Sequence, residues 1–343
     1  MYTICGFSLE PGTKKQVILG IDMGGQEHFG QVPAIPEGVE MHAGEEDYYQ
    51  MPATIICGRK PGKTVLFTAG IHSSEFPGIP ATIRTASEID PADVEGNIIM
   101  IHCVNMSGYN KRSIVYVYED DFNLNGMYPG NPDGTVGERI AAYFVSEIFP
   151  HVDFICDFHS GGNGESMYPC LFYPVGCSAE KEAEAAAKAL EIPHLIRSTA
   201  RKGEIHYAAH HFNVPGFILE TGMSSLNYKE WVDLDIRNIY LLLAHLGVYH
   251  KPGLDTATKP KKIYCENDYI ESDRYGLWYP ALRENEMFRA GDELGHLEDF
   301  FGNRLKTYYA KNDGVVFYAT WGIYAEPGFP LVAVGYNDGA IDV

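Results

Sequence analysis

The fold is decided by residues 64–78, which read TVLFTAGIHSSEFPG. The first six residues are apolar or β-branched and predict a buried strand, and the Gly and Pro residues that follow mark where it ends. His72 and Glu75 come just after the carboxyl end of this strand, where ligands gather in open α/β sheets. Because they lie three residues apart on a tight turn, both side chains can reach one cation.

Around this stretch the sequence alternates between apolar strands and helices. We expect strands at residues 53–57, 64–69, 97–104, 152–158 and 216–219, and helices at residues 80–89, 135–149, 179–190, 203–212 and 227–249. Thr135 with Glu138 is typical of a capping box, and Ser178 and Asn227 are typical N-cap residues. The alternation predicts an α/β fold with a mostly parallel, mixed central sheet that helices cover on both faces.

The alternation ends after the last expected helix. Residues 253–262 are rich in Lys, Thr and turn-forming residues, which is typical of a linker between domains. Residues 263–343 contain short strand-like runs separated by turn signals, and these predict a small all-β domain. We therefore expect a large domain over residues 1–252, in which residues 1–50 have no clear assignment, followed by this β domain.

The composition excludes several classes of partner. Of 343 residues, 45% are hydrophobic, and 26 Lys and Arg against 46 Asp and Glu give a formal net charge of −20. Such an acidic surface repels phosphate backbones and anionic lipids, so we expect neither a nucleic-acid nor a membrane partner. The N-terminus has no secretory pattern, and the seven cysteines include no C-x-x-C pair. We therefore expect a cytoplasmic protein with reduced thiols.

Charged and metal-binding side chains occur where three of the expected strands end. His72 and Glu75 follow the first strand, His159 ends the strand at residues 152–158, and Glu220 ends the strand at residues 216–219. The carboxyl ends of parallel strands share one edge of a sheet, so these side chains should meet. Two imidazoles and one carboxylate with an open fourth position suit a catalytic zinc ion. Glu220 is then the carboxylate that remains to move protons.

Four short motifs carry a resemblance to a known family. They read IHSSE at residues 71–75, NLNGMYPG at 123–130, DFHSG at 157–161 and LETG at 219–222. In this order the chain resembles the succinylglutamate desuccinylase/aspartoacylase family, which belongs to the zinc carboxypeptidase-like hydrolases. The resemblance extends over roughly residues 50–343. It implies a zinc carboxypeptidase-like fold, an appended C-terminal β domain and one zinc ion per chain.

The resemblance also implies roles for single residues. His72, Glu75 and His159 match the zinc ligands, and Glu220 matches the general base and acid. Arg112 is the best match for the arginine that polarises the scissile carbonyl. For Glu220 the plain alternative is a carboxylate that stabilises a helix N-terminus.

Two further positions bear on the substrate. Asn125 matches an asparagine that contacts the substrate, although it is also a common turn residue. The family pattern Asp-Leu-Asn-Arg reads Asn-Leu-Asn-Gly here, so Gly126 stands where an arginine would hold a substrate carboxylate. For Arg112 the alternative is an exposed loop cation. Because of Gly126, the resemblance implies zinc hydrolysis but does not imply an acidic amino-acid substrate.

The expected function is that of a zinc-dependent amidohydrolase, which removes the acyl group from a small N-acylated amino acid or a related amide. A metallocarboxypeptidase acting on peptides is the first alternative, and Gly126 counts against it. A metal-binding or ligand-binding protein that has lost catalysis is the second. We expect a small-molecule amide as the partner and leave the formation of a homo-oligomer open.

Overall fold

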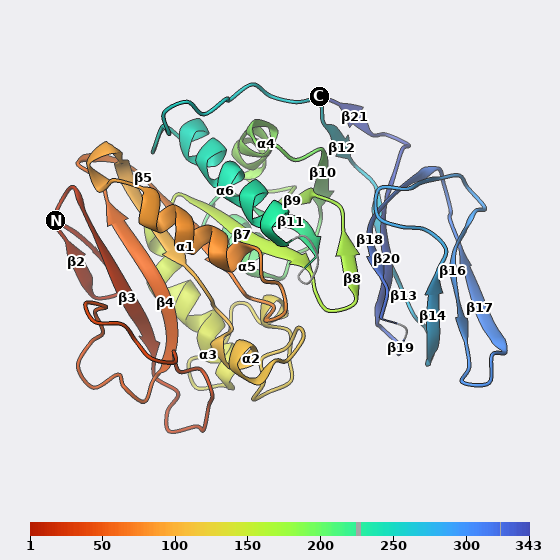
Figure 1. Cartoon of the computed structure of the whole chain (residues 1–343), viewed down its shortest axis with the longest axis horizontal. Helices are drawn as coiled ribbons and strands as arrows, with labels where there is room; N and C mark the ends of the chain where they lie inside the picture. The colour runs from red at the N-terminus through yellow and green to blue at the C-terminus, as the bar shows by residue number, and fades with distance from the viewer. Residues whose placement is uncertain (224–227, 323) are drawn as a thin grey trace.

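A large mixed sheet flanked by helices occupies one side of the molecule, and a smaller group of antiparallel strands occupies the other (Figure 1). The structure is a computed structural model and describes residues 1–223, 228–322 and 324–343. The predicted α/β fold with a C-terminal β domain is confirmed.

The large sheet contains ten of the described strands, in the order β21-β12-β10-β9-β11-β7-β5-β6-β4-β3. In chain order these strands are β3 (Thr13–Ile21), β4 (Tyr49–Cys57), β5 (Lys60–Ala69), β6 (Glu95–Ile101), β7 (Phe154–Gly161), β9 (Cys170–Pro174), β10 (His194–Ser198), β11 (Gly216–Met223), β12 (Lys262–Tyr264) and β21 (Ile341–Asp342). β5, β6, β7 and β11 run parallel in the centre. β9 pairs antiparallel with β11, which makes the sheet mixed.

Helices cover both faces of this sheet, as expected for strands that are buried on both sides. They are α1 (Gly78–Glu88), α2 (Met106–Lys111), α3 (Val136–Tyr143), α4 (Glu180–Ala189), α5 (Glu204–His211) and α6 (Tyr228–His245). One apolar core includes buried residues of α3 and α5, and a second core includes those of α1, α4 and α6. The two cores lie on opposite faces of the sheet and hold the central strands in place.

Residues 1–50, which the sequence left unassigned, extend the sheet at one edge. β3 pairs antiparallel with β4 from Thr13 opposite Cys57 to Ile21 opposite Tyr49. β1 (Tyr2–Ile4) and β2 (Phe7–Leu9) form a separate hairpin. The second half of β3 is largely buried and its first half largely exposed, so its sequence lacks the uniform apolar run of the central strands.

The helix starts differ in how well the sequence predicted them. The capping box of Thr135 and Glu138 is confirmed at the start of α3. The expected cap at Ser178 is wrong, because α4 begins after Ala179 without a side-chain cap. The Ser178 hydroxyl instead donates to the side-chain oxygen of Asn213. The expected cap at Asn227 lies outside the described residues.

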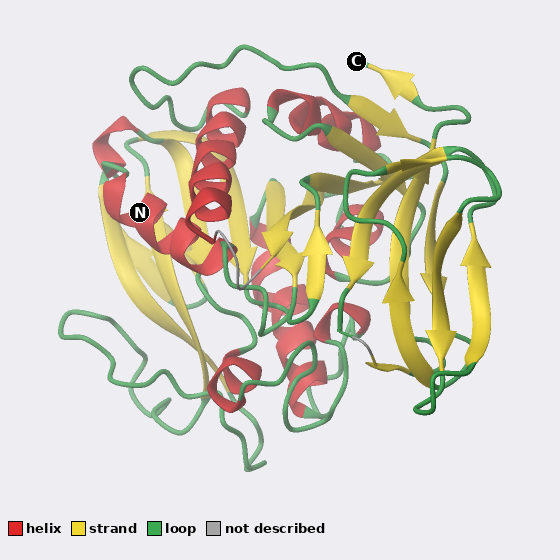
Figure 2. Cartoon of the chain, turned by 45° about the vertical axis from the view of Figure 1, so that its right-hand side comes forward, coloured by secondary structure: helices red, strands yellow, loops and turns green. Residues whose placement is uncertain are grey.

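The C-terminal strands form two antiparallel sheets (Figure 2). Their members, with one strand from the large domain, are β8 (Glu165–Met167), β13 (Asn267–Glu271), β14 (Gly276–Pro280), β15 (Met287–Phe288), β16 (Glu293–Glu298), β17 (Arg304–Tyr309), β18 (Gly314–Thr320), β19 (Tyr324–Ala325) and β20 (Pro330–Tyr336). β8 pairs with β18, and β12 and β21 join the large sheet. Backbone pairing therefore crosses the expected boundary at residues 253–262, and the exact domain limits stay a prediction.

Candidate active site

The side chains singled out in the sequence come from three neighbouring central strands. His72 and Glu75 lie in the turn between β5 and α1. His159 and Glu220 lie within β7 and β11, because these strands continue for three and four residues beyond the expected ends at residues 158 and 219. Glu220 stands directly opposite His159 in the register of the two strands. The shared edge of the sheet thus brings all four residues together.

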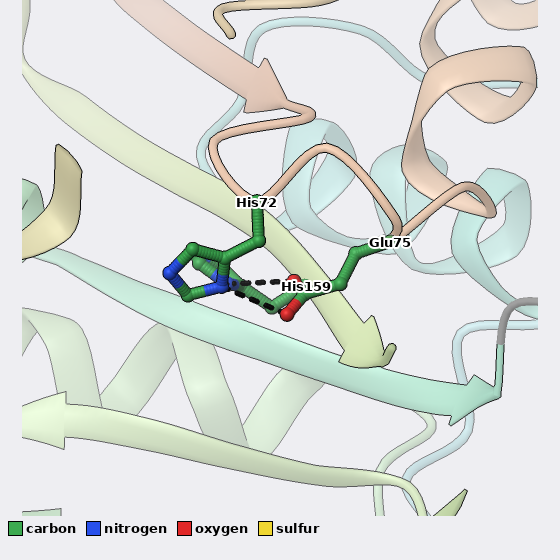
Figure 3. Close-up of side chains that lie close together, drawn as sticks. All are labelled: His72, Glu75 and His159. Atoms are coloured by element: carbon green, nitrogen blue, oxygen red, sulfur yellow. Dashed lines mark hydrogen bonds and ion pairs between the residues drawn. The ribbon is translucent and has the colours of Figure 1, made fainter. Parts of the chain in front are cut away.

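His72, Glu75 and His159 form a cluster whose ligand atoms all lie within 4.8 Å of one another (Figure 3). Nδ1 of His72 is 2.8 Å from Glu75 Oε1, and Nδ1 of His159 is 2.9 Å from Glu75 Oε2. The two Nδ1 atoms are 3.2 Å apart. Atoms bound at about 2.1 Å to one tetrahedral ion lie about 3.4 Å from each other, so the three side chains fit a single metal ion.

The second nitrogen of each ring fixes its orientation. Nε2 of His72 donates to Asn123 Oδ1 at 3.0 Å, and Nε2 of His159 donates to Asp157 Oδ2 at 2.7 Å. Asp157 is in turn held by the Thr68 hydroxyl, which donates to Oδ1 at 2.9 Å. Since both Nε2 atoms carry the hydrogen, both Nδ1 lone pairs are directed towards the cluster, as metal-binding histidines require.

The electrostatics of the cluster favour positive charge at its centre. Burial lowers the pKa of His159, but Asp157 and Glu75 outweigh it and hold that pKa well above its usual range. The pKa of His72 is also raised, because Glu75 outweighs burial. Burial raises the pKa of Glu75, yet the two imidazoles bring it to about 2. A site that stabilises protonated imidazoles in this way can stabilise a metal cation in place of the protons.

Glu220 is a buried carboxylate that stands beside this cluster, opposite His159. Its side chain is 9% exposed, and within the described part of the chain its Oε2 has no hydrogen-bond partner. Burial, with a further contribution from Glu75, raises its pKa to about 8. A divalent cation nearby would lower this pKa, because positive charge favours the ionised carboxylate. An unpartnered buried carboxylate is well placed to exchange protons with a bound molecule.

Glu220 faces a cavity of about 500 Å³, a volume typical of small-molecule sites. The lining residues include His72 and His159 of the candidate metal site, residues from the end of β10 to α5, and residues of β13 in the C-terminal domain. They are His72, Asn125, His159, Phe172, Ser198, Thr199, Ala200, Lys202, His206, Ile218, Glu220, Asn267 and Tyr269. The cavity therefore lies between the large domain and the C-terminal β domain.

Asn125 lines the cavity, whereas Arg112 does not. The Oδ1 atom of Asn125 accepts a hydrogen bond of 3.0 Å from the backbone of Glu204, which leaves its amide nitrogen for other partners. Arg112 is exposed at the end of α2, in the left-handed conformation with φ 58°. Gly126 is also exposed, and a Cβ atom added there would meet open space. The structure thus brings Asn125, but not Arg112, to the cluster.

Sequence reasoning missed one whole wall of the cavity. In the sequence, helix amphipathicity alone accounts for His206, yet the ring lines the cavity and its Nε2 lies 2.8 Å from Ser198 Oγ. Burial, aided by His210 and Arg201, lowers the pKa of His206 to about 4, so the ring is neutral at pH 7. The spacing of His206 and His210 shows that they share a helix face. Only the docking of α5 against the sheet shows that His206 borders the cavity.

Comparison with known proteins agrees with the geometry of the site. Residues 61–246 match the succinylglutamate desuccinylase/aspartoacylase catalytic domain. The chain is 27% identical to an N-alpha-acetyl-L-2,4-diaminobutyric acid deacetylase of Halomonas elongata, over 78% of this chain and 80% of that relative.

None of the helices in the described ranges is both long and apolar enough to cross a membrane.

Solved structures share the fold. The product-bound ectoine utilization protein EutE (DoeB) of Ruegeria pomeroyi superposes with a TM-score of 0.75 at 22% identity, over 85% of this chain and 92% of that one. A succinylglutamate desuccinylase of Silicibacter sp. TM1040 superposes with a TM-score of 0.74 at 22% identity, over 84% and 89%. Since the family's catalytic domain matches more than half of the sequence, this chain belongs to the succinylglutamate desuccinylase/aspartoacylase family.

Proposed function

We propose that this chain is a zinc-dependent deacylase that hydrolyses the amide bond of a small N-acylated amino acid. The observation that carries the proposal is Glu220, which lines the same cavity as His72 and His159 and whose Oε2 has no hydrogen-bond partner among the described residues. Family membership supports hydrolysis of an amide, and the relative from Halomonas elongata supports an N-acetylated amino acid among the substrates to test.

His72, Glu75 and His159 are the residues that would hold the zinc ion, through two nitrogen atoms and a carboxylate. Bound there, zinc would supply Lewis-acid chemistry, which polarises a carbonyl group and lowers the pKa of a water molecule. His159 is kept in the required orientation by Asp157, and His72 by Asn123. These two contacts place both Nδ1 atoms before any substrate enters.

Glu220 moves the protons in the proposed reaction. Its Oε2 takes one proton from the attacking water as the water oxygen bonds to the acyl carbon. When the carbon–nitrogen bond breaks, Glu220 returns that proton to the leaving amine, so the products are a carboxylic acid and a free amine. The amide nitrogen of Asn125 is available to donate to a substrate oxygen, since its Oδ1 is already engaged.

The proposal is tested by assaying zinc-loaded protein against N-acetyl, N-succinyl and longer N-acyl amino acids. Glu220→Gln should retain zinc and lose roughly 10²–10⁴-fold in kcat, because the amide cannot accept the proton. Glu230→Gln, at an exposed position of α6, is the matched control. A wild-type rate for Glu220→Gln would contradict the mechanism. If C-terminal residues are released from peptides faster than N-acyl amino acids are hydrolysed, the chain is a carboxypeptidase. If the protein binds zinc and turns over none of these substrates, it is a non-catalytic protein.

The predicted role of Arg112 in steadying the oxyanion is kept as a proposal and examined in the same assay. Arg112→Met should lower kcat with little change in zinc content if the guanidinium reaches the substrate during turnover. An unchanged kcat would assign that role to another group.

The cytoplasmic location likewise stays a prediction, with which the free state of all seven cysteines agrees.

A further inference from the structure

Glu204 is a buried carboxyl group that the proposed mechanism does not use. It is the first residue of α5, and its side chain is fully buried. Its two carboxyl oxygens lie 3.4 and 3.5 Å from the hydroxyl oxygen of Thr68 on β5. Among the described residues, Thr68 is the only hydrogen-bond partner of this carboxyl group. A carboxyl group buried with so little support calls for an explanation, because the burial of an unpaired charge is costly.

The Thr68 hydroxyl connects Glu204 to the candidate metal site. It donates its single hydrogen to Asp157 Oδ1 at 2.9 Å. Asp157 Oδ2 in turn accepts from Nε2 of His159 at 2.7 Å. Since the hydroxyl hydrogen is used, only the lone pairs of the Thr68 oxygen remain for Glu204, and only a protonated carboxyl group can donate to them. The four side chains then form one chain of hydrogen bonds that ends at a candidate zinc ligand.

The charges around Glu204 favour its protonated form. Burial, with a further contribution from Asp157, holds the pKa of Glu204 well above its usual range. Two carboxyl groups beside one buried hydroxyl group repel each other when both are ionised, so one of them keeps its proton. Asp157 contacts the imidazole of His159, whereas Glu204 has no ion-pair partner in the described part of the chain. The proton therefore belongs on Glu204.

The backbone of Glu204 supports the other candidate histidine ligand. Its N–H donates to Asn125 Oδ1 at 3.0 Å. The backbone N–H of Asn125 donates to Asn123 Oδ1 at 2.9 Å, and the same oxygen accepts from Nε2 of His72. One residue at the start of α5 thus contacts the supports of both rings.

We propose that Glu204 is a positioning residue of the metal site, which donates a hydrogen bond to Thr68 and thereby fixes the orientation of His159. Glu204 is not among the described residues that line the cavity, so it acts on the site only through its neighbours. This inference rests on the proposed function, because it concerns the same zinc site, and it adds a group that holds the ligands in place.

The first test measures the zinc affinity of the full chain in competition with a chromophoric chelator. Glu204→Met, which has a similar length and no donor, should lower zinc affinity about fivefold, the size of one neutral hydrogen bond. Glu204→Gln, whose amide nitrogen can donate to Thr68, should stay within about twofold of the wild type. Glu230→Met, at an exposed position of α6, is the matched control. Equal losses in the Met and Gln variants, or no loss in either, would overturn the inference.

A double-mutant cycle with Thr68 separates positioning from packing. Thr68→Val should lower zinc affinity about tenfold, and Thr68→Ser, which keeps the hydroxyl group, should retain it. In the Thr68→Val background, Glu204→Met should add less than about twofold, because the route to His159 is already cut. Two losses that multiply would contradict the proposed route. So would equal losses in Thr68→Ser and Thr68→Val, a comparison that holds even if Glu204→Met does not fold.

Infrared spectroscopy tests the donor itself and requires neither zinc nor substrate. The difference spectrum between metal-free wild type and Glu204→Gln at pH 7 should contain the C=O stretching band of a protonated carboxyl group. This band, together with the changes in zinc affinity, supports the inference even if no substrate is hydrolysed. A difference spectrum with carboxylate bands alone would overturn it even if the deacylase activity is found.

Discussion

His72 and His159 lie against the carboxylate of Glu75, whereas His102 and His206 lie against hydroxyl groups. The first pair has raised pKa values, and burial lowers those of the second pair to about 4. All four rings are largely removed from solvent, so burial by itself does not distinguish them. The acidic neighbours do, because they stabilise positive charge that burial alone would exclude.

The same difference separates rings that can bind a cation from rings that serve packing. The Nε2 atom of His102 lies 2.9 Å from the Thr54 hydroxyl, and its Nδ1 lies 3.1 Å from that of Thr82. Both ring nitrogens are thus engaged by hydroxyl groups, as expected for a core histidine. His159 instead has Nε2 bound to Asp157, while its Nδ1 faces His72 and Glu75.

Removing one of the two imidazoles that contact Glu75 should have the largest effect. In His72→Ala the cluster keeps one imidazole and one carboxylate, too few for a stable catalytic zinc site. We expect stoichiometric zinc to be lost and kcat to fall roughly 10³-fold, since Lewis-acid stabilisation amounts to several kcal/mol. Elemental analysis and the deacylase assay measure both. His151→Ala, at an exposed position, should keep its zinc. Full zinc occupancy in His72→Ala would refute the assigned ligand set.

Removing the charge of Asp157, which contacts His159 but is not itself an expected ligand, should have an intermediate effect on zinc affinity. Asp157→Asn keeps an oxygen that can accept from Nε2 of His159 but removes the negative charge. Changes of this kind lower metal affinity about 10–100-fold. Titration of the metal-free protein with zinc, in competition with a chromophoric chelator, measures the change. Asp153→Asn, at the exposed position just before β7, is the control. Equal zinc affinities of Asp157→Asn and the wild type would show that the hydrogen bond, and not the charge, matters.

His102 should affect only stability, and only in acid. Its pKa is about 6.5 when unfolded and about 4 when folded, so between these values the unfolded state binds more protons. Stability should therefore fall as the pH drops from about 6.5 to about 4. At 1.36 kcal/mol per unit, the loss from this group is on the order of 3 kcal/mol.

Urea unfolding of wild type and His102→Gln between pH 8 and pH 4.5 measures this contribution. At pH 8 the ring is neutral in both states, so the difference there reports the packing cost alone. The variant should then show a shallower decline in acid. Parallel declines for the two proteins would indicate that other groups dominate the acid sensitivity.

Much of the fold could be predicted because its signals are local. Apolar runs marked β5, β7 and β11, and Thr135 with Glu138 marked the start of α3. The start of α4 could not be predicted from Ser178, because that hydroxyl bonds to Asn213, far along the chain. Residues 16–21 look strand-like, but the sequence gives β3 no clear assignment because only half of it is buried, and a half-buried edge strand has no continuous apolar pattern.

The sequence by itself determined which residues form the candidate metal site. His72 and Glu75 share one turn, and parallel strands deliver His159 and Glu220 to the same edge, so their positions at strand ends were sufficient. Only the tertiary structure decided what else borders the cavity. Lys202 precedes a helix whose docking depends on long-range packing, and β13 comes from a separate sheet. No local pattern encodes such contacts, because their partners lie far apart in the chain.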